Sequence, residues 1–200
     1  MIKVNDISQG SPEWFKAKAG VPSASSFDKI LTTKGDPSKQ AQKYMYQLAG
    51  EAITGVKEEG FQSADMTRGI EMEDEARRLY EVARSVDVET VGMCYPDEGK
   101  SILCSPDGLV GEEGGIEIKC PKMATHVEYL LSGKMPTIYI QQVQGSMYVT
   151  GRMWWDFISY YPGMKPLIVR IVRDNLFMKM LEIELGKFCV GLAETIKKIS

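Results

Sequence analysis

Residues 104–120, CSPDGLVGEEGGIEIKC, place two acids and a lysine in a short run of strand-forming residues. The EEGG at 112–115 is typical of a hairpin turn, with SILCSPDGLVG and GIEIKC as the two strands. If the turn is centred near Glu112, Asp107 and Glu117 face each other across the hairpin. Side chains opposed in this way have Cβ atoms about 4.5–5.5 Å apart.

The chemistry of this hairpin depends on which side chains share a face. Strands alternate with a period of two, so Glu117 and Lys119 lie on one face while Ile116 and Ile118 turn into the core. Two carboxylates at close range repel each other unless a cation lies between them, and Mg²⁺ favours sites with one or two carboxylates. The pattern therefore indicates a Mg²⁺ site. An ordinary Pro-Asp-Gly turn followed by a half-buried edge strand is the alternative interpretation.

The rest of the chain predicts helices around a central sheet. One helix is expected to begin at Ser25, with Asp28 as its capping-box partner, and another covers 39–54 and ends at Gly55. Further helices are expected at 68–84, 138–151 and 181–199, and strands at 152–161 and 165–173. This order predicts one α/β domain over residues 1–200, with N-terminal helices at about 11–90 and the catalytic sheet and C-terminal helices at about 91–200.

The composition excludes several classes of protein. A chain of 200 residues with 44% hydrophobic content suits a globular domain with a sizeable core. Its net charge of -3 gives no overall basic signature for nucleic acid, so any DNA contact needs a local basic surface. The 4 cysteines form no CxxC pair and there is 1 histidine, so zinc is not expected. With neither a signal peptide nor a membrane-spanning run, a cytoplasmic protein without membrane contact is expected.

The order of motifs resembles the phage lambda exonuclease and YqaJ-type viral recombinase family of PD-(D/E)XK nucleases. The resemblance is carried by RGxxxExxAR at 68–77, SPDG at 105–108, EIK at 117–119 and QVQ at 142–144. It runs from about Trp14 to the C-terminal helix. It implies a restriction-endonuclease-like core, which is a central mixed sheet flanked by helices.

The same resemblance implies roles for individual residues. The catalytic set would be Glu73, Asp107, Glu117, Lys119 and Gln142. One or two Mg²⁺ ions, for which Mn²⁺ substitutes, would be held by Asp107, Glu117, the Ile118 backbone carbonyl and Glu73. Lys119 would orient the attacking water and offset charge rather than act as a base, because an ordinary lysine pKa is ~10.4.

A second stretch, GSPEWFKAKAGVPSASS at 10–26, indicates an anion site, because a helix N-terminus with a serine cap presents free N–H groups. A plain capped helix is the alternative interpretation. The family's WxxxRxGxxTAS pattern holds a DNA 5′-phosphate and is matched at Trp14, Gly20, Ala24 and Ser25, with Lys18 in place of the arginine. Lysine meets a phosphate as a point charge rather than as a bidentate fork. The residues expected to contact the 5′-phosphate or DNA are Lys18, Ser23, Ser25, Arg68 and Gln144.

The function implied is a Mg²⁺-dependent exonuclease that digests one strand of linear duplex DNA from 5′ to 3′. It would leave 3′ single-stranded tails for recombination by strand annealing. The resemblance also implies a ring-shaped homotrimer, a single-strand annealing protein as partner, and a phage or prophage gene expressed in bacterial cytoplasm. Two alternatives stay open: a structure-specific PD-(D/E)XK endonuclease, and a DNA-end-binding recombination protein whose metal site is idle.

Other conspicuous residues have structural interpretations. Of the adjacent Trp154 and Trp155, one ring is expected in the core and one outside it. His126 has no partner motif and is expected to be structural. Cys104 and Cys120 are expected to be buried small hydrophobic residues.

Overall fold

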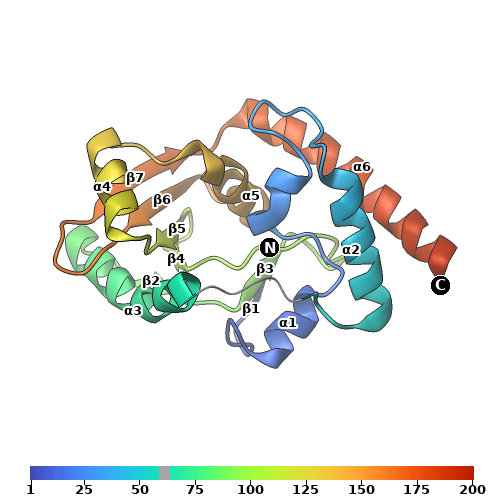
Figure 1. Cartoon of the computed structure of the whole chain (residues 1–200), viewed down its shortest axis with the longest axis horizontal. Helices are drawn as coiled ribbons and strands as arrows, with labels where there is room; N and C mark the ends of the chain where they lie inside the picture. Colours follow the sequence, from blue (N-terminus) through green and yellow to red (C-terminus); the bar gives the residue numbers. More distant parts are fainter. Residues whose placement is uncertain (59–63) are drawn as a thin grey trace.

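The computed structural model describes residues 1–58 and 64–200, and within them a five-stranded mixed sheet lies between helices (Figure 1). The strand order is β2-β4-β5-β6-β7, in which β5 and β6 are parallel and the other neighbours antiparallel. The strands are β2 (Val88–Glu89), β4 (Gly108–Val110), β5 (Gly114–Lys119), β6 (Trp154–Ser159) and β7 (Leu167–Val172). The predicted mixed sheet flanked by helices is confirmed, but β5 is its central strand and not an edge.

The hairpin of β4 and β5 has the predicted register. Gly108 pairs with Ile116 and Val110 with Gly114, so the same register continues to Asp107 opposite Glu117. The turn itself differs from the prediction, because it occupies 111–113 and the two glycines that follow already belong to β5.

Gly114 and Gly115 leave room for side chains of the neighbouring strand β6 and are not part of the turn. They pair in register with Trp154 and Trp155 of β6. A Cβ at Gly115 would lie 2.3 Å from the Trp155 ring, and one at Gly114 would lie 2.0 Å from the Trp154 ring. Trp155 is fully buried and Trp154 half-buried, which confirms that one ring of the pair lies in the core.

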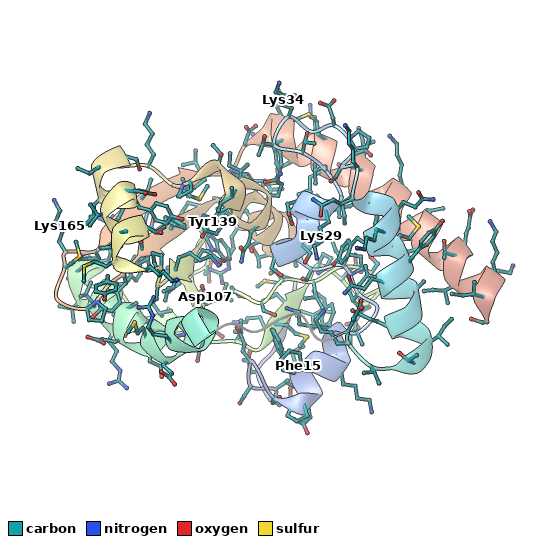
Figure 2. All side chains as sticks on the ribbon, in the orientation of Figure 1. Phe15, Lys29, Lys34, Asp107, Tyr139 and Lys165 are labelled. Carbon is teal, nitrogen blue, oxygen red and sulfur yellow. The ribbon has the colours of Figure 1, made fainter. Side chains whose placement is uncertain are left out.

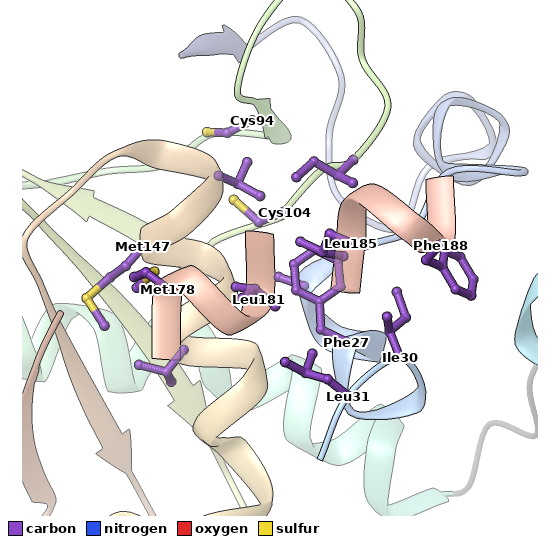
Figure 3. Close-up of a cluster of buried hydrophobic side chains, with 14 of the residues drawn as sticks. Phe27, Ile30, Leu31, Cys94, Cys104, Met147, Met178, Leu181, Leu185 and Phe188 are labelled. Carbon is purple, nitrogen blue, oxygen red and sulfur yellow. The ribbon is translucent and has the colours of Figure 1, made fainter. Parts of the chain in front are cut away.

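Helices cover both faces of the sheet. On one face α3 (Ala64–Arg84) packs Ala76 and Tyr80 against Ile116 and Ile118. On the other face lie α4 (Met123–Ser132) and, after the short η2 (Thr137–Tyr139), α5 (Ile140–Thr150). The largest hydrophobic cluster joins α5 to η1 (Ala24–Lys29), α2 (Ala41–Thr54) and α6 (Asn175–Ile199) (Figure 3).

The N-terminal segment departs from the prediction at Ser25. Helix α1 (Pro12–Lys18) is capped by Ser11, but η1 is a 3₁₀ turn whose N-cap is Ser23, without a side-chain capping bond. Ser23 bridges to Leu103, so the chain is already anchored there, and the Ser23 and Ser25 hydroxyls bond to each other at 2.9 Å. The predicted capping box is therefore wrong.

Other boundaries shifted as well, and α3 begins at Ala64 rather than at residue 68. The last helix begins before residue 181, because the Asp174 carboxylate caps it by accepting from the N–H groups of Leu176 and Phe177. Only the end of 101–111 is a strand, since Cys104 instead forms an isolated bridge to Cys94. The small sheet of β1 (Ile2–Val4) and β3 (Met93–Tyr95), together with β2, α4 and η2, was not predicted.

The structural interpretations of the remaining residues are confirmed. His126 is fully buried, with Nδ1 2.7 Å from the Ser159 hydroxyl and Nε2 3.1 Å from the Lys165 carbonyl oxygen. Cys104 and Cys120 are buried free thiols. Within the described residues, no helix has the length and apolar character needed to cross a bilayer.

We expect Gly115→Ala to lower the free energy of unfolding by about 1–3 kcal/mol, because the added methyl meets the fully buried Trp155 ring, which has no room to move. Denaturant unfolding measures the change. Gly186→Ala on α6 is the matched control: nothing lies within 4 Å of its Cβ position, so it should stabilise the helix by roughly 0.5–1 kcal/mol. Equal stabilities for the two alanine variants would contradict the tryptophan packing.

Candidate active site

The two hairpin acids lie on the face of the sheet that α5 covers. Glu117 is only 2% exposed, whereas Asp107 is half-buried just before β4. The Asp107 Oδ2 accepts a hydrogen bond of 2.6 Å from the backbone N–H of Ile118 on the facing strand. Figure 2 shows Asp107 and Tyr139 near the middle of the molecule, while Lys34 and Lys165 lie at its periphery.

Two side chains hold the Glu117 carboxylate. The Lys119 ammonium and the Gln142 side-chain amide both lie 2.6 Å from Glu117 Oε1. Lys119 comes from the same strand and Gln142 from α5, so the sheet and the helix above it meet at one oxygen. The Lys119 Nζ also lies 5.2 Å from the centre of the Tyr139 ring, which stabilises its positive charge.

The acids are electrostatically strained. Burial, together with the Asp107 charge, raises the pKa of Glu117 to about 7, although Lys119 opposes the shift. Burial also raises the pKa of Asp107. Glu73 on α3 interacts electrostatically with these acids. Burial and the Asp107 charge raise the pKa of Glu73 to about 7. These carboxylates therefore lack sufficient positive charge around them.

Lys119 keeps its proton in this environment. Burial disfavours its ammonium, but the charges of Glu117 and Asp107 outweigh that effect and raise the pKa of Lys119 above its ordinary value. The raised pKa of Lys119 agrees with the sequence-based interpretation that this residue offsets charge, and it disfavours a role for Lys119 as a base.

The donor set fits a hard divalent cation. Carboxylate oxygens are the ligands that Mg²⁺ prefers, and it commonly takes one or two of them with water and substrate oxygens. Among the described residues no group of three or more His, Cys, Asp or Glu side chains is arranged to hold a metal. The side-chain ligands to consider are therefore Asp107 and Glu117, with Glu73 as a neighbouring charge rather than part of a preformed cage.

Lys18 lies close enough to Glu117 for their charges to interact. It is 6% exposed, and its Nζ lies 3.9 Å from the centre of the Trp14 ring. Burial and the nearby Lys57 lower the pKa of Lys18 to about 8, and Glu117 opposes that shift. Ser23 is buried and Ser25 exposed, with their hydroxyls bonded together. A buried ammonium is suited to an anion such as phosphate.

Two of the predicted DNA contacts are engaged elsewhere. Arg68 donates to the carbonyl oxygens of Cys120 and Pro121 and so ties α3 to the end of β5. Gln144 is buried: its amide donates to the Val172 carbonyl and accepts from the Asp174 N–H. The reason is geometric, since residues two apart on a helix do not share a face, so Gln144 cannot follow Gln142 into the cluster.

Arg152, which directly precedes the segment leading into β6, has a structural role that was not predicted. Its buried guanidinium donates to the carbonyl oxygens of Val110, Gly111 and Gly114 and so fixes the turn between the two acids. A single arginine after Gly151 carries no local signal, because the turn that it holds lies about forty residues earlier.

Comparison with known proteins gives a consistent result. The model of the YqaJ-like viral recombinase domain matches residues 13–153. The crystal structure of an alkaline exonuclease from Laribacter hongkongensis is similar at 35% identity over 94% of this chain and 96% of that one, with a TM-score of 0.85. Its complex with dAMP has the same identity, coverage and TM-score.

A more distant structure agrees in fold alone. It is a phage related exonuclease from Haemophilus somnus 129PT, 17% identical over 90% of this chain and 96% of that one, with a TM-score of 0.68. No curated protein matches the chain. The expected PD-(D/E)XK core is confirmed by these structures.

In EDTA, the free energy of unfolding should fall as pH rises from about 4.5 to about 7. The folded protein keeps protons on Glu73 and Glu117 in this window, while the unfolded chain, with the ordinary value of 4.5, has released them. Glu117→Gln should flatten this slope, whereas Glu194→Gln at an exposed position on α6 should leave it unchanged. Urea unfolding at several pH values measures it, and a wild-type stability that rises across the window would refute the expectation.

Proposed function

Since the chain belongs to the YqaJ-like viral recombinase domain family, we propose that it is a Mg²⁺-dependent 5′–3′ exonuclease of linear duplex DNA. It would leave 3′ single-stranded tails for recombination by strand annealing. A nuclease role is supported by the 35% identity to an alkaline exonuclease. The observation that carries the proposal is the pairing of Asp107 with Glu117 on one face of the central hairpin, with Lys119 beside them.

The carboxylates would bind the metal. Asp107 and Glu117, with the Ile118 backbone carbonyl, would hold one Mg²⁺, and Glu73 would contribute to a second ion. Bound Mg²⁺ would offset the negative charge that builds on the phosphate and leaving oxygens. The raised pKa values of Asp107 and Glu117, caused mainly by burial, support this, because a bound divalent cation stabilises the charged form of a buried carboxylate.

Gln142 would position the Glu117 carboxylate, and Lys119 would neutralise negative charge. The Gln142 amide fixes one Glu117 oxygen, which leaves the second oxygen free to turn toward a cation. Lys119 stays protonated, so it can donate to the attacking water or to a phosphate oxygen, but it does not accept the proton of that water.

The polarity of digestion would come from Lys18. Its buried ammonium would receive the 5′-phosphate together with the Ser23 and Ser25 hydroxyls, and its electrostatic coupling to Glu117 supports a position close to the cleaved bond. The homotrimeric ring, the single-strand annealing partner and action in bacterial cytoplasm belong to the same proposal. All three follow from the family resemblance.

Asp107→Ala and Lys119→Ala should each lower the rate of digestion at least about a hundredfold, because the first removes a proposed metal ligand and the second a positive charge beside the reacting phosphate. Both should keep the wild-type circular dichroism. Lys179→Ala, at an exposed position on α6, is the matched control and should digest normally. A Lys119→Ala protein with the wild-type rate would remove Lys119 from the mechanism.

The substrate is tested with linear duplex labelled separately at each 5′ and 3′ end, in Mg²⁺ or EDTA, beside closed circles. The proposal expects Mg²⁺-dependent release of the 5′ label while circles stay intact. Cut circles would favour the structure-specific endonuclease. Binding without any product in Mg²⁺ would favour an idle end-binding protein.

Metal binding can be measured without DNA. We expect Mg²⁺ at pH 7.5 to raise the thermal midpoint of the wild-type protein, because a ligand that binds only the folded state stabilises it. In Asp107→Ala this increase should be absent, and in Lys179→Ala it should persist. An equal increase in all three proteins would place the metal elsewhere.

A further inference from the structure

Glu51 is a buried carboxylate outside the candidate active site. It lies near the end of α2 and is 3% exposed. Its Oε2 accepts from the N–H of Gly20 at 3.1 Å, and its Oε1 accepts from the Gln47 amide at 2.9 Å and the Glu58 N–H at 3.1 Å. The Lys57 ammonium lies 4.0 Å from Oε2. A side chain this buried that binds three donors holds separate segments together.

The first of these segments is the turn after Lys18. Gly20 has a φ of +75°, and a Cβ there would lie 2.7 Å from the Cβ of Ala52 on α2. The turn therefore rests directly on α2, and the hydrogen bond to Glu51 fixes it there. Lys18 lies only two residues before this contact, so the turn determines where its ammonium lies.

The second segment follows α2. The bond from the Glu58 N–H to Glu51 fixes the backbone next to Lys57. The charge of Lys57 in turn acts on Lys18. One carboxylate thus sets the position of Lys18 from one side and that of Lys57 from the other.

We propose that Glu51 is a positioning residue for the DNA end: it holds the Gly20 turn so that Lys18 lies where the 5′-phosphate is received. The inference rests on the proposed role of Lys18 in binding that phosphate. Glu51 itself would not contact DNA, because its oxygens are occupied by donors from the protein.

The chemistry requires a carboxylate at this position. Both oxygens of Glu51 accept, and together they serve Gly20, Gln47 and Glu58. A glutamine amide has one acceptor oxygen and one NH₂ group, so its NH₂ would face at least one N–H donor and lose that bond. Glu51→Gln therefore loosens the clamp while preserving the size of the side chain.

The test compares kcat/KM on duplexes with 5′-phosphate and 5′-hydroxyl ends. We expect Glu51→Gln to reduce the ratio of the two values about tenfold toward one, mainly through KM on phosphorylated ends. Asp156→Asn is the matched control, because Asp156 is an equally buried carboxylate that binds Tyr80 and Arg170 on the α3 side of the sheet. It should keep the wild-type ratio even if it lowers the thermal midpoint.

The outcomes separate the two proposals. A wild-type protein without preference for phosphorylated ends would overturn the Lys18 assignment and the Glu51 inference together. A wild-type preference that Glu51→Gln retains in full would overturn the inference alone. If circular dichroism shows that Glu51→Gln does not fold, Glu51→Asp carries the same expectation, since its shorter side chain cannot reach Gly20.

Discussion

The structure depends on how the buried charge of Glu117 is compensated. This carboxylate lies on the central strand of the sheet, 2% exposed, and an isolated ion in such a place costs several kcal/mol even after the protein relaxes. Lys119 and Gln142 offset part of this cost, and the Ile118 backbone N–H does the same for Asp107. The remainder appears as raised pKa values, and it is what makes the hairpin receptive to a cation.

The groups that compensate this charge share one scaffold. Gln142 belongs to α5, which packs so closely on η1 that a Cβ at Gly145 would lie 2.5 Å from the Phe27 ring. The turn into η1 carries Ser23, which bridges to Leu103, shortly before Asp107. The same contacts therefore hold the two acids, Asp107 and Glu117, and the segment that carries Lys18. A displacement of η1 would disturb both. The close packing keeps the distance between them constant.

Local pattern predicted the hairpin register, the helices at 39–54 and 68–84, and the strands of β6 and β7, because each has a strong period of its own. It also predicted that Asp107, Glu117 and Lys119 lie together, because the alternation of side chains along a hairpin is set by local geometry. The central place of β5 depends on a parallel partner far along the chain and left no local signal. Gly114 and Gly115 resembled turn residues in the sequence. The reason that glycine is needed there is a tertiary contact, because the tryptophan rings of β6 leave no room for a side chain. Glu51 and Arg152 were overlooked for the same reason: the turn that each of them holds, at Gly20 and at residues 111–114, lies about thirty to forty residues away in the sequence.

The parallel pairing of β5 with β6 has a consequence for the order of folding. The hairpin that carries both acids can close locally, but the parallel partner of β5 follows only after α4 and α5 along the chain. Contacts of such sequence separation form late, because the entropy of closing the loop is lost before the contacts are gained. During synthesis the acids are therefore present well before the strand and helix that bury and orient them. A nascent chain that ends before Ile140 would have both carboxylates but neither α5 nor β6 beside them.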